Sequence, residues 1–369
     1  MNPTADQLGA GIEACGCLTP FGDAAASHRA LVEGRRALQP RPVMGADGGD
    51  LVPLALLGPM NEELPPRGLT ALHTLAAEIP DGPWGTPRRP VIVTSSNFGV
   101  GSLHAYTRDR DERHLAHGAP YASVDLLRRE FRWGEHVHVF SHACVSAHLG
   151  LMHGSRLLRA GIADRVLVFT YDFVSPFVAG GFHALKILNE GMPAPYAARA
   201  TGSIGLGDGI GFAVLTADAA PFRIEAQTLH NEMHHFTNNQ ADGAGFAVGA
   251  ETMAAAARGR RVWVKGHGTG TLEAGRLEAE AFARAFPGAP LVSWKGSLGH
   301  TLGSCGLVEL ALTLAALGDG RIPGTVGTTA PAFTDTIALA PFSGAACDGV
   351  VVASNAFGGA HAALLLGRG

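Results

Sequence analysis

The sequence predicts a layered α/β protein, and three observations carry this prediction. Continuous apolar strands such as 165–171 (RVLVFTY) are typical of a sheet that is covered on both faces. Segments whose apolar residues recur at helical spacing lie between these strands. Of the 369 residues, 46% are hydrophobic, only 16% are charged and 50 are glycine. This composition favours a large core with many turns, in two domains or in one unit built from two halves.

Strands and helices alternate through the first part of the chain. We expect strands at 11–17, 91–94, 137–140 and 165–171, and helices at 24–33, 69–79, 120–131, 147–160 and 175–190. At 202–216 we expect a glycine turn that leads into a further strand. Proline and glycine are frequent at 39–68, so we expect a surface loop there.

A second round of elements begins near Phe222. We expect strands at 223–228, 261–265, 291–295, 348–353 and 361–366, and helices at 247–258, 276–286 and 301–317. The element order resembles that of the first round, which indicates an internal duplication, although the two halves share too little sequence identity to demonstrate one. We therefore expect an N-terminal half at 1–218 and a C-terminal half at 219–369.

Composition argues against several classes of protein. The formal net charge of −4 disfavours a nucleic-acid partner, because such binding needs a basic surface. No apolar run approaches the roughly 20 residues that span a bilayer, and residues 1–8 lack the pattern of a signal peptide. The five cysteines are scattered, which disfavours a disulfide framework and suits a reducing cytoplasm. No HExxH or paired CxxC spacing is present, so we expect no metal site.

The segment 141–161 is the strongest candidate for chemistry. An expected strand turns there into an expected helix, and Cys144 lies at the turn between small neighbours. A thiol near a helix N-terminus faces the positive end of the dipole and free N–H groups, which lower its pKa and favour the reactive thiolate. A buried structural cysteine is the alternative, and it is the commoner fate of a free thiol.

Four motifs in order extend the case beyond Cys144. They are ACVS at 143–146, HGTGT at 267–271, KGSLGHTLGSCG at 295–306 and SNAFGGAH at 354–361. They resemble the β-ketoacyl-ACP synthases of the Cys-His-His kind, the condensing enzymes of fatty-acid and polyketide assembly. Weaker similarity at 18–22, 175–188, 205–211 and 233–237 extends the resemblance almost end to end. The resemblance implies a thiolase fold, with five αβαβα layers built from two similar halves, and a dimer as the usual assembly.

The resemblance also implies a reaction, the decarboxylative Claisen condensation. Cys144 would take an acyl group from a carrier thioester, and malonyl-ACP would lose CO₂ and attack it to give 3-ketoacyl-ACP. His267 and His300 would donate Nε2–H hydrogen bonds to the oxygen on which negative charge develops. The backbone N–H groups of Cys144 and Phe357 would form the oxyanion hole. Phe357 would also gate the site, unless it is a core anchor.

Other residues would support this chemistry. The resemblance pairs Lys295 with Glu278 in an ion pair that holds the histidine loops, although Glu278 could instead be solvated. Thr269 and Thr271 would bind the amides of the 4′-phosphopantetheine arm of acyl carrier protein, or else satisfy loop backbone groups. No other cofactor is implied. Some arginines could attract an acidic carrier protein, although solvated helix positions are the better prediction for them. These are Arg128, Arg129, Arg156 and Arg159.

The chain departs from the family pattern in three places. Gly275 stands where the family usually has Asp, with Glu273 as a candidate replacement, and Asp208 stands where Glu is usual. The loop 354–361 is shorter than the family's, and its His361 stands where Asn is typical. These departures indicate a specialised polyketide branch, such as the aryl polyene or related polyene pathways.

Rival functions remain open. Chain-length-factor subunits share the fold as silent partners of a ketosynthase heterodimer, but they usually lack the nucleophile, so the intact Cys144, His267 and His300 favour activity. A thiolase would need a second catalytic cysteine, and Cys347 lies outside any such motif. Initiating enzymes of the Cys-His-Asn kind are disfavoured by the GHTLG context of His300. We expect a homodimer, or a heterodimer with a ketosynthase-like subunit.

Overall fold

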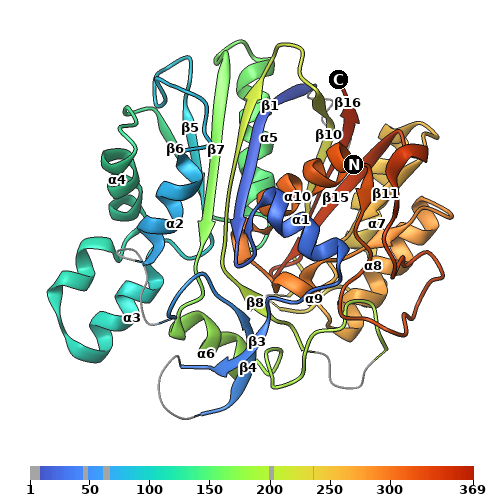
Figure 1. Ribbon diagram of the computed structural model, residues 1–369, viewed down its shortest axis with the longest axis horizontal. Coiled ribbons are helices and arrows are strands. Elements are labelled where there is room, and N and C mark those ends of the chain that lie inside the picture. The colour runs from blue at the N-terminus through green and yellow to red at the C-terminus, as the bar shows by residue number, and fades with distance from the viewer. Residues whose placement is uncertain (1–8, 45–48, 61–66, 199–202, 236) are drawn as a thin grey trace.

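One long mixed sheet runs through the molecule (Figure 1). The computed structural model describes residues 9–44, 49–60, 67–198, 203–235 and 237–369, and the statements below concern these residues. Along the sheet the strand order is β12-β11-β15-β16-β10-β1-β9-β7-β5-β6, and the short β2 pairs with β1. The strands are β1 (Ala10–Thr19), β2 (Gly22–Asp23), β5 (Val91–Thr94), β6 (Val137–Phe140), β7 (Arg165–Asp172), β9 (Gly209–Thr216), β10 (Phe222–Asn231), β11 (Val262–Lys265), β12 (Leu291–Val292), β15 (Gly349–Ala356) and β16 (Ala360–Arg368).

The two halves of this sheet have the same internal order. Counted outward from the centre, the first half runs β1-β9-β7-β5-β6 and the second runs β10-β16-β15-β11-β12. When the five strands of each half are numbered in chain order, both halves run 1-5-4-2-3 outward from the centre. Strands with the same number therefore occupy equivalent positions. The halves join where Ala10–Ile12 pairs antiparallel with Phe222–Ile224. The expected boundary at 218/219 lies in the connection between β9 and β10 and remains a proposal.

Five layers follow from where the helices pack. Two helices, α5 (Ser146–Arg159) and α10 (Cys305–Asp319), lie between the half-sheets and share one apolar core with strands of both halves. The first half-sheet is covered on its other face by α2 (Arg67–Ala76) and α4 (Pro120–Glu130), and the second by α7 (Ala244–Ala257) and α8 (Leu272–Ala285). Figure 1 shows these outer helices on opposite sides of the molecule. The expected αβαβα arrangement is confirmed.

Shorter elements connect these layers. The helices are α1 (Ala24–Val32), α3 (Val100–Asp109), η1 (Glu112–His117), α6 (Pro176–Ala184), α9 (Lys295–Leu298), η2 (Leu302–Ser304) and η3 (Gly344–Ala346). The remaining strands are β3 (Gln39–Pro42), β4 (Leu51–Ala55), β8 (Leu206–Gly207), β13 (Arg321–Ile322) and β14 (Phe342–Ser343).

The prediction of a surface loop at 39–68 is wrong in part. Strands β3 and β4 pair antiparallel within this segment, and β4 continues the small sheet to β8. Val52 and Leu54 are fully buried there. The prolines of the segment were the misleading signal, because proline is tolerated in a short edge strand such as β3. Residues 45–48 and 61–66 lie outside the described chain, as do residues 1–8, 199–202 and 236, which were parts of other expectations.

One segment contradicts the expectation that no apolar run approaches the length of a membrane span. Leu302–Asp319, which comprises η2 and α10, is long and apolar enough to cross a bilayer by length and composition, with 72% of it buried inside the protein. Its apolar character is explained by its place in the central layer, where both half-sheets pack against it.

Candidate active site

The candidate nucleophile lies in a tight turn between β6 and α5. Ala143 adopts a left-handed backbone conformation, with φ of 45°, which is unfavourable for a residue with a Cβ. The Ser146 hydroxyl stabilises this turn by accepting from the His142 N–H at 2.8 Å and donating to the Ala143 carbonyl at 2.7 Å. Cys144 is thereby fixed just before the first turn of α5.

Two glycines allow α5 to lie directly on the first half-sheet. A Cβ added at Gly150 would lie 2.7 Å from Thr94 Cγ2, and one at Gly154 would lie 3.0 Å from Leu215 Cδ1. Real Cβ atoms essentially never approach as closely as the contact at Gly150 requires, and a Cβ at Gly154 would force the neighbouring side chain to move. The position of the helix, and with it that of Cys144, therefore depends on these small residues.

The predicted lowering of the Cys144 pKa is wrong for this enclosed thiol. Burial raises the pKa well above its ordinary value, and the nearby Cys305 raises it further. Lys295 and a hydrogen bond from the Phe357 backbone N–H act in the opposite direction but do not outweigh burial. The resting group is therefore a thiol, since desolvation disfavours the charged form more than the helix terminus favours it.

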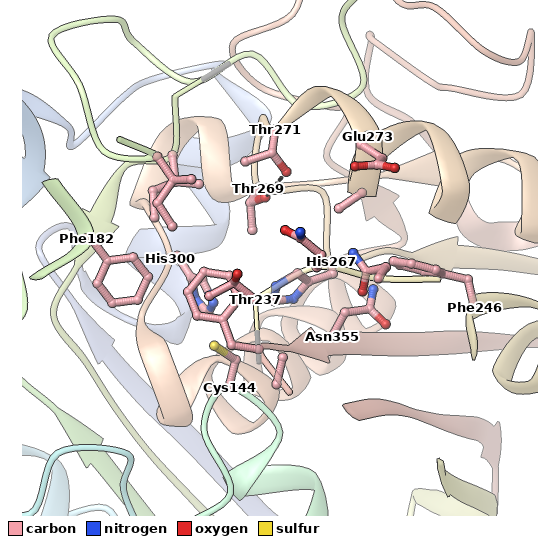
Figure 2. Close-up of a pocket in the computed structure, with 17 residues that line it drawn as sticks. Cys144, Phe182, Thr237, Phe246, His267, Thr269, Thr271, Glu273, His300 and Asn355 are labelled. Atoms are coloured by element: carbon pink, nitrogen blue, oxygen red, sulfur yellow. Dashed lines mark hydrogen bonds between the residues drawn. The ribbon is translucent and has the colours of Figure 1, made fainter. Parts of the chain in front are cut away.

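His267 and His300 lie beside Cys144, on loops from the other half of the molecule. Figure 2 shows the three side chains converging on one pocket. The imidazole rings are 4.8 Å apart between centroids and nearly perpendicular, at 86°. His267 follows β11, and His300 follows β12 and α9, while Cys144 follows β6. These strands belong to parallel sets in each half, so their carboxyl ends bring the three residues to one site.

Both histidines are held neutral. Burial lowers the pKa of His267 and that of His300 well below the ordinary value, and the positive charge of Lys295 lowers both further. Nδ1 of His300 accepts the Leu302 N–H at 3.1 Å, so its Nε2 carries the hydrogen. That Nε2 is buried and has no hydrogen-bond partner in the described chain. It is a donor available for a substrate oxygen.

The loop of His300 packs against the glycine turn before β9. The His300 N–H donates to the Gly205 carbonyl at 2.7 Å, and a Cβ at Gly207 would lie 2.1 Å from the Leu298 carbonyl oxygen. Asp208 of the same turn is buried, and its carboxylate accepts the N–H groups of Leu57 and Val174, both at 2.7 Å. The shorter acid found in place of the family's Glu is thus fully bonded.

Glu278 fixes the loop of His267 by accepting four hydrogen bonds. The His267 and Gly268 N–H groups donate at 2.7 and 2.8 Å, the Asn355 side-chain amide at 2.9 Å and the Tyr196 hydroxyl at 2.8 Å. The carboxylate is 1% exposed, so the alternative of a solvated residue is wrong. Because its partners are backbone amides, Glu278 acts on the shape of the loop.

The predicted ion pair between Lys295 and Glu278 is wrong in its partner. Lys295 Nζ donates to Glu309 at 2.5 Å, and Glu309 lies on α10. The expected strand 291–295 is also shorter, since β12 ends at Val292 and Lys295 begins α9. The two acids lie on different helices, Glu309 on the central α10 and Glu278 on the outer α8.

The pocket around these groups has a volume of about 220 Å³. Phe357 lines it, is 38% exposed, and stacks on Phe182 at 5.7 Å between ring centroids, so it is not a core anchor. Thr269, Thr271 and Glu273 line the same pocket (Figure 2), and the two threonine hydroxyls are 3.3 Å apart. One part of the pocket lining is therefore apolar, formed by Phe182 and Phe357, and another part, the polar mouth, is formed by Thr269, Thr271 and Glu273.

A second buried chain of hydrogen bonds supports Asn355 from behind. His361 Nδ1 lies 2.8 Å from Asn355 Oδ1, and His361 Nε2 lies 2.9 Å from a carboxylate oxygen of Glu232. Asn355 in turn donates to Glu278. The histidine that replaces the family's Asn thus connects Glu232 to the acid that fixes the His267 loop.

The position of Gly275 is covered by Tyr196. A Cβ at Gly275 would be in ordinary contact with Tyr196, whose hydroxyl bonds Glu278. Glu273, the candidate replacement for the family's Asp, lines the pocket instead of this buried region. An aromatic residue, which no sequence motif singled out, therefore lies next to the position where the family usually has Asp.

The site also holds three potential metal ligands. Ligand atoms of His267, His300 and Cys305 lie within 4.8 Å of one another. His300 already uses its Nδ1 lone pair for the Leu302 N–H, so its Nε2 has a hydrogen and no lone pair to offer. The arrangement suits hydrogen-bond donation and does not fit a metal ion.

Sequence reasoning missed several buried partners of the site. Glu309, Lys265 and Asp172 are each at most 4% exposed. Each is a lone charged residue within or at the end of an apolar run, which is a visible signal for a buried ion pair. The four arginines considered for carrier binding are a different case. Arg156 and Arg159 lie at the opposite end of α5 from Cys144, roughly 20 Å along the helix.

Comparisons with known proteins agree with this geometry. The model of the β-ketoacyl synthase C-terminal domain matches residues 224–329, which include both histidines. The 3-oxoacyl-[acyl-carrier-protein] synthase 2 of Vibrio cholerae is 28% identical over 253 residues, covering 62% of this chain and 61% of that protein. The tetracenomycin polyketide synthase ketoacyl synthase alpha subunit of Streptomyces glaucescens is 30% identical over 219 residues, covering 53% and 51%.

Solved structures share the whole fold. A β-ketoacyl synthase from Burkholderia phymatum superimposes with a TM-score of 0.82 at 19% identity, covering 100% of both chains. A chain of the complex between a ketosynthase and its chain length factor from Xenorhabdus doucetiae gives a TM-score of 0.78 at 21% identity, covering 98% of both. The sequence matches span about half to three-fifths of the curated relatives' length. Residues 224–329 thus match the β-ketoacyl synthase C-terminal domain, and the chain as a whole is similar in sequence to β-ketoacyl synthases and shares their fold.

Proposed function

We propose that the protein is a β-ketoacyl-ACP synthase, an acyltransferase that joins an acyl group held on Cys144 to malonyl-ACP and releases 3-ketoacyl-ACP and CO₂. One observation carries this proposal. Cys144 and the neutral pair His267 and His300 face one pocket, from loops at the carboxyl ends of strands in opposite halves. A silent partner subunit has no use for this combination of a nucleophile with the unpaired buried donor of His300.

Acylation starts from the Cys144 thiol. The sulfur attacks the thioester carbonyl carbon, its new bond to that carbon replaces the bond to the pantetheine sulfur, and the thiol proton passes to that leaving sulfur. The N–H groups of Cys144 and Phe357 hold the carbonyl oxygen while it carries negative charge. The bond from the Phe357 N–H towards the Cys144 sulfur supports this placement.

Condensation uses the two histidines. Malonyl-ACP loses CO₂, and the released electron pair forms an enolate whose oxygen accepts N–H bonds from His267 and His300. The enolate carbon attacks the acyl-enzyme carbonyl, the bond to Cys144 breaks, and the thiolate regains a proton. The unpartnered Nε2–H of His300 and the lowered pKa of both rings support these roles, since a neutral imidazole donates without adding charge.

The other predicted residues have supporting roles. Glu278 shapes the His267 loop, and Lys295 supplies positive charge beside both histidines. Phe357 and Phe182 close the pocket as a stacked pair, so that Phe357 acts as the gate. Thr269 and Thr271 bind the phosphopantetheine arm of acyl carrier protein at the polar mouth.

The partner in the assembly is a second ketosynthase-like chain, either identical or a chain-length-factor subunit. Support comes from β6, which is an outer strand of the long sheet and exposes 41% of Val139. Solved relatives include ketosynthase/chain length factor complexes. Gly275, His361 and the short loop 354–361 support a specialised polyketide or polyene branch, and the scattered free cysteines support a cytoplasmic location.

Mass spectrometry of the intact protein tests the nucleophile. The wild type, mixed with acyl-carrier thioesters of several chain lengths, gains the mass of one acyl group, and added malonyl carrier then yields the 3-ketoacyl product. Cys144→Ala gains no acyl group and makes no product, whereas Cys347→Ala, at a half-buried cysteine outside the pocket, behaves as the wild type.

Two other results would change the assignment. An acyl group that still appears on Cys144→Ala means that another residue is the nucleophile. A folded wild type that accepts no acyl group from any donor means that the chain is the silent, chain-length-factor-like subunit.

A further inference from the structure

A second buried lysine lies beside the pair formed by Lys295 and Glu309. Lys265 ends β11, two residues before His267, and its side chain is 0% exposed. Its ammonium group pairs with one oxygen of the Glu309 carboxylate, while Lys295 takes the other. The chain has only three lysines, and two of them meet at this one glutamate.

Among the described residues, Glu309 is the one acid that acts on Lys265, whereas Lys295 also interacts with the buried Glu278. The groups that face Lys265 are Glu309 and Cys305 on α10, Lys295 on α9, His148 on α5 and the Trp294 ring, 5.9 Å from Nζ. Burial raises the pKa of Cys305 to about 11 and lowers that of His148 to about 4, so both are neutral. Two ammonium groups therefore share the Glu309 carboxylate, and Lys265 has no acid of its own.

Burying the ammonium group of Lys265 beside an acid that it shares with Lys295 costs folding free energy. A purely structural role is therefore a poor explanation for Lys265. Burying an ion without full compensation disfavours the folded state, and a packed apolar side chain often does better. In agreement, burial and the charge of Lys295 lower the pKa of Lys265 to about 8. The pair of Lys295 with Glu309 would be neutral without Lys265.

The charge of Lys265 acts on both members of the histidine pair. Lys265 and Lys295 both lower the pKa of His267 and of His300, so each lysine acts on each ring. Cys305 lies between the two groups, because its sulfur is within 4.8 Å of ligand atoms of both rings and also interacts with both lysines. In a buried site this field has little solvent to screen it.

We propose that Lys265 is a positioning residue of the condensing site: Glu309 is held between the ammonium groups of Lys265 and Lys295, and the positive charge of Lys265 stabilises the enolate that His267 and His300 receive. The inference rests on the proposed function. Lys265 does not touch the substrate. It acts through the histidines, as a charge that is already in place before the enolate forms.

Lys265→Met tests this proposal, because it removes the charge and keeps the approximate length of the side chain. The readout is the single-turnover rate at which preformed acyl-enzyme reacts with malonyl carrier, which removes the titration of Cys144 from the measurement. We expect a fall of roughly tenfold, with the KM for the carrier within about twofold. Lys186→Met, at the exposed third lysine, should leave the rate unchanged.

Stability separates this role from a structural one. We expect the Tm of Lys265→Met at pH 7 to equal or exceed that of the wild type, because the variant no longer buries an ammonium group that has to share its acid with Lys295. Relative to the variant, the wild type should gain stability as pH rises from 8 to 10, because folded Lys265 has lost the proton that it keeps in the unfolded chain. The buried cysteines act in the opposite direction but do so equally in both proteins, so the difference between the two isolates Lys265. A variant that loses Tm and rate together would show a structural residue and overturn the proposal.

Two further outcomes are decisive. A Lys265→Met enzyme that condenses within about twofold of the wild-type rate overturns the proposal. If the variant does not fold, the wild-type pH profile decides: the single-turnover rate should fall as pH passes about 8, where Lys265 loses its proton, and a flat profile overturns the proposal. A wild type that accepts no acyl group at all would instead overturn the proposed function.

Discussion

Glu278 shows how much one carboxylate can hold in place. Replacing it with Ala leaves two backbone N–H groups, the Tyr196 hydroxyl and the Asn355 amide without their acceptor in a buried region. We expect Glu278→Ala to lower the free energy of unfolding by about 3–5 kcal/mol and to abolish condensation, because the His267 loop loses its anchor.

Denaturant unfolding measures the change, with Glu280→Ala as the matched control. Glu280 lies on the same helix and pairs with Arg276 at the partly exposed surface, so its loss should cost less than about 0.5 kcal/mol. Equal stabilities of the two variants would contradict the anchoring role of Glu278.

At the scale of residues, the sequence predicted which motif residues meet but not all of their partners. Cys144, His267 and His300 do line one pocket. Lys295 was paired with the wrong acid because both Glu278 and Glu309 are acids on nearby helices, and only the three-dimensional path of the chain after β12 distinguishes them. The direction of the Cys144 pKa was missed for a related reason, since the depth of burial cannot be read from one helix terminus.

At the scale of elements, most strands and helices were predicted because their apolar patterns are strong. The fully buried strands β7 and β9 illustrate this, with continuous apolar runs in the sequence. The failure at 39–68 has the opposite cause: β3 and β4 are short, proline-containing and stabilised by pairing with each other and with the distant β8. Local sequence carries little information about such non-local pairing.

Strand β6 provides the prediction at this scale, which tests the proposed assembly. Placing a charge at its exposed Val139 should prevent another chain from pairing there, because a buried lysine in a strand interface has no partner. We expect Val139→Lys to shift the protein from dimer to monomer in light scattering coupled to size-exclusion chromatography.

Ile162→Lys is the control, because Ile162 is 56% exposed but lies after α5, outside the strand. It should leave the dimer unchanged. A Val139→Lys protein that remains dimeric would mean that the partner binds elsewhere.

At the scale of the whole molecule, the two halves are also bonded through a buried acid. Asp172, at the end of β7, accepts the Ser95 hydroxyl at 2.8 Å and the Ser96 N–H at 3.1 Å. It also accepts a backbone bond from Ser304, which belongs to the second half. Burial raises its pKa to about 7 in spite of these bonds.

This pKa has a consequence for stability. Because the folded chain keeps the Asp172 proton that the unfolded chain releases near its ordinary value of 3.8, the stabilisation is complete below that value and is lost as pH rises through 7. Asp172→Asn should therefore gain stability relative to the wild type between pH 4 and 8, by up to roughly 4 kcal/mol. Denaturant midpoints across this range measure the difference.

The comparison between variant and wild type is needed because His148 acts in the opposite direction. Its pKa is lowered to about 4, so its contribution to stability rises with pH over part of the same range in both proteins. A constant difference between variant and wild type would contradict the raised pKa of Asp172.

The placement of the lysines determines where amine-reactive reagents can modify the folded protein. Two of the three ammonium side chains are sealed inside, and the chain carries its surface positive charge on arginine. Lys186 is therefore the exposed lysine side chain that acylating reagents, reductive methylation or a lysine-specific protease can reach on the folded molecule. A label attached through a lysine side chain therefore goes to one position, just after α6, and its neighbour Ile187 lines the pocket of the thiol that we propose to carry the acyl group.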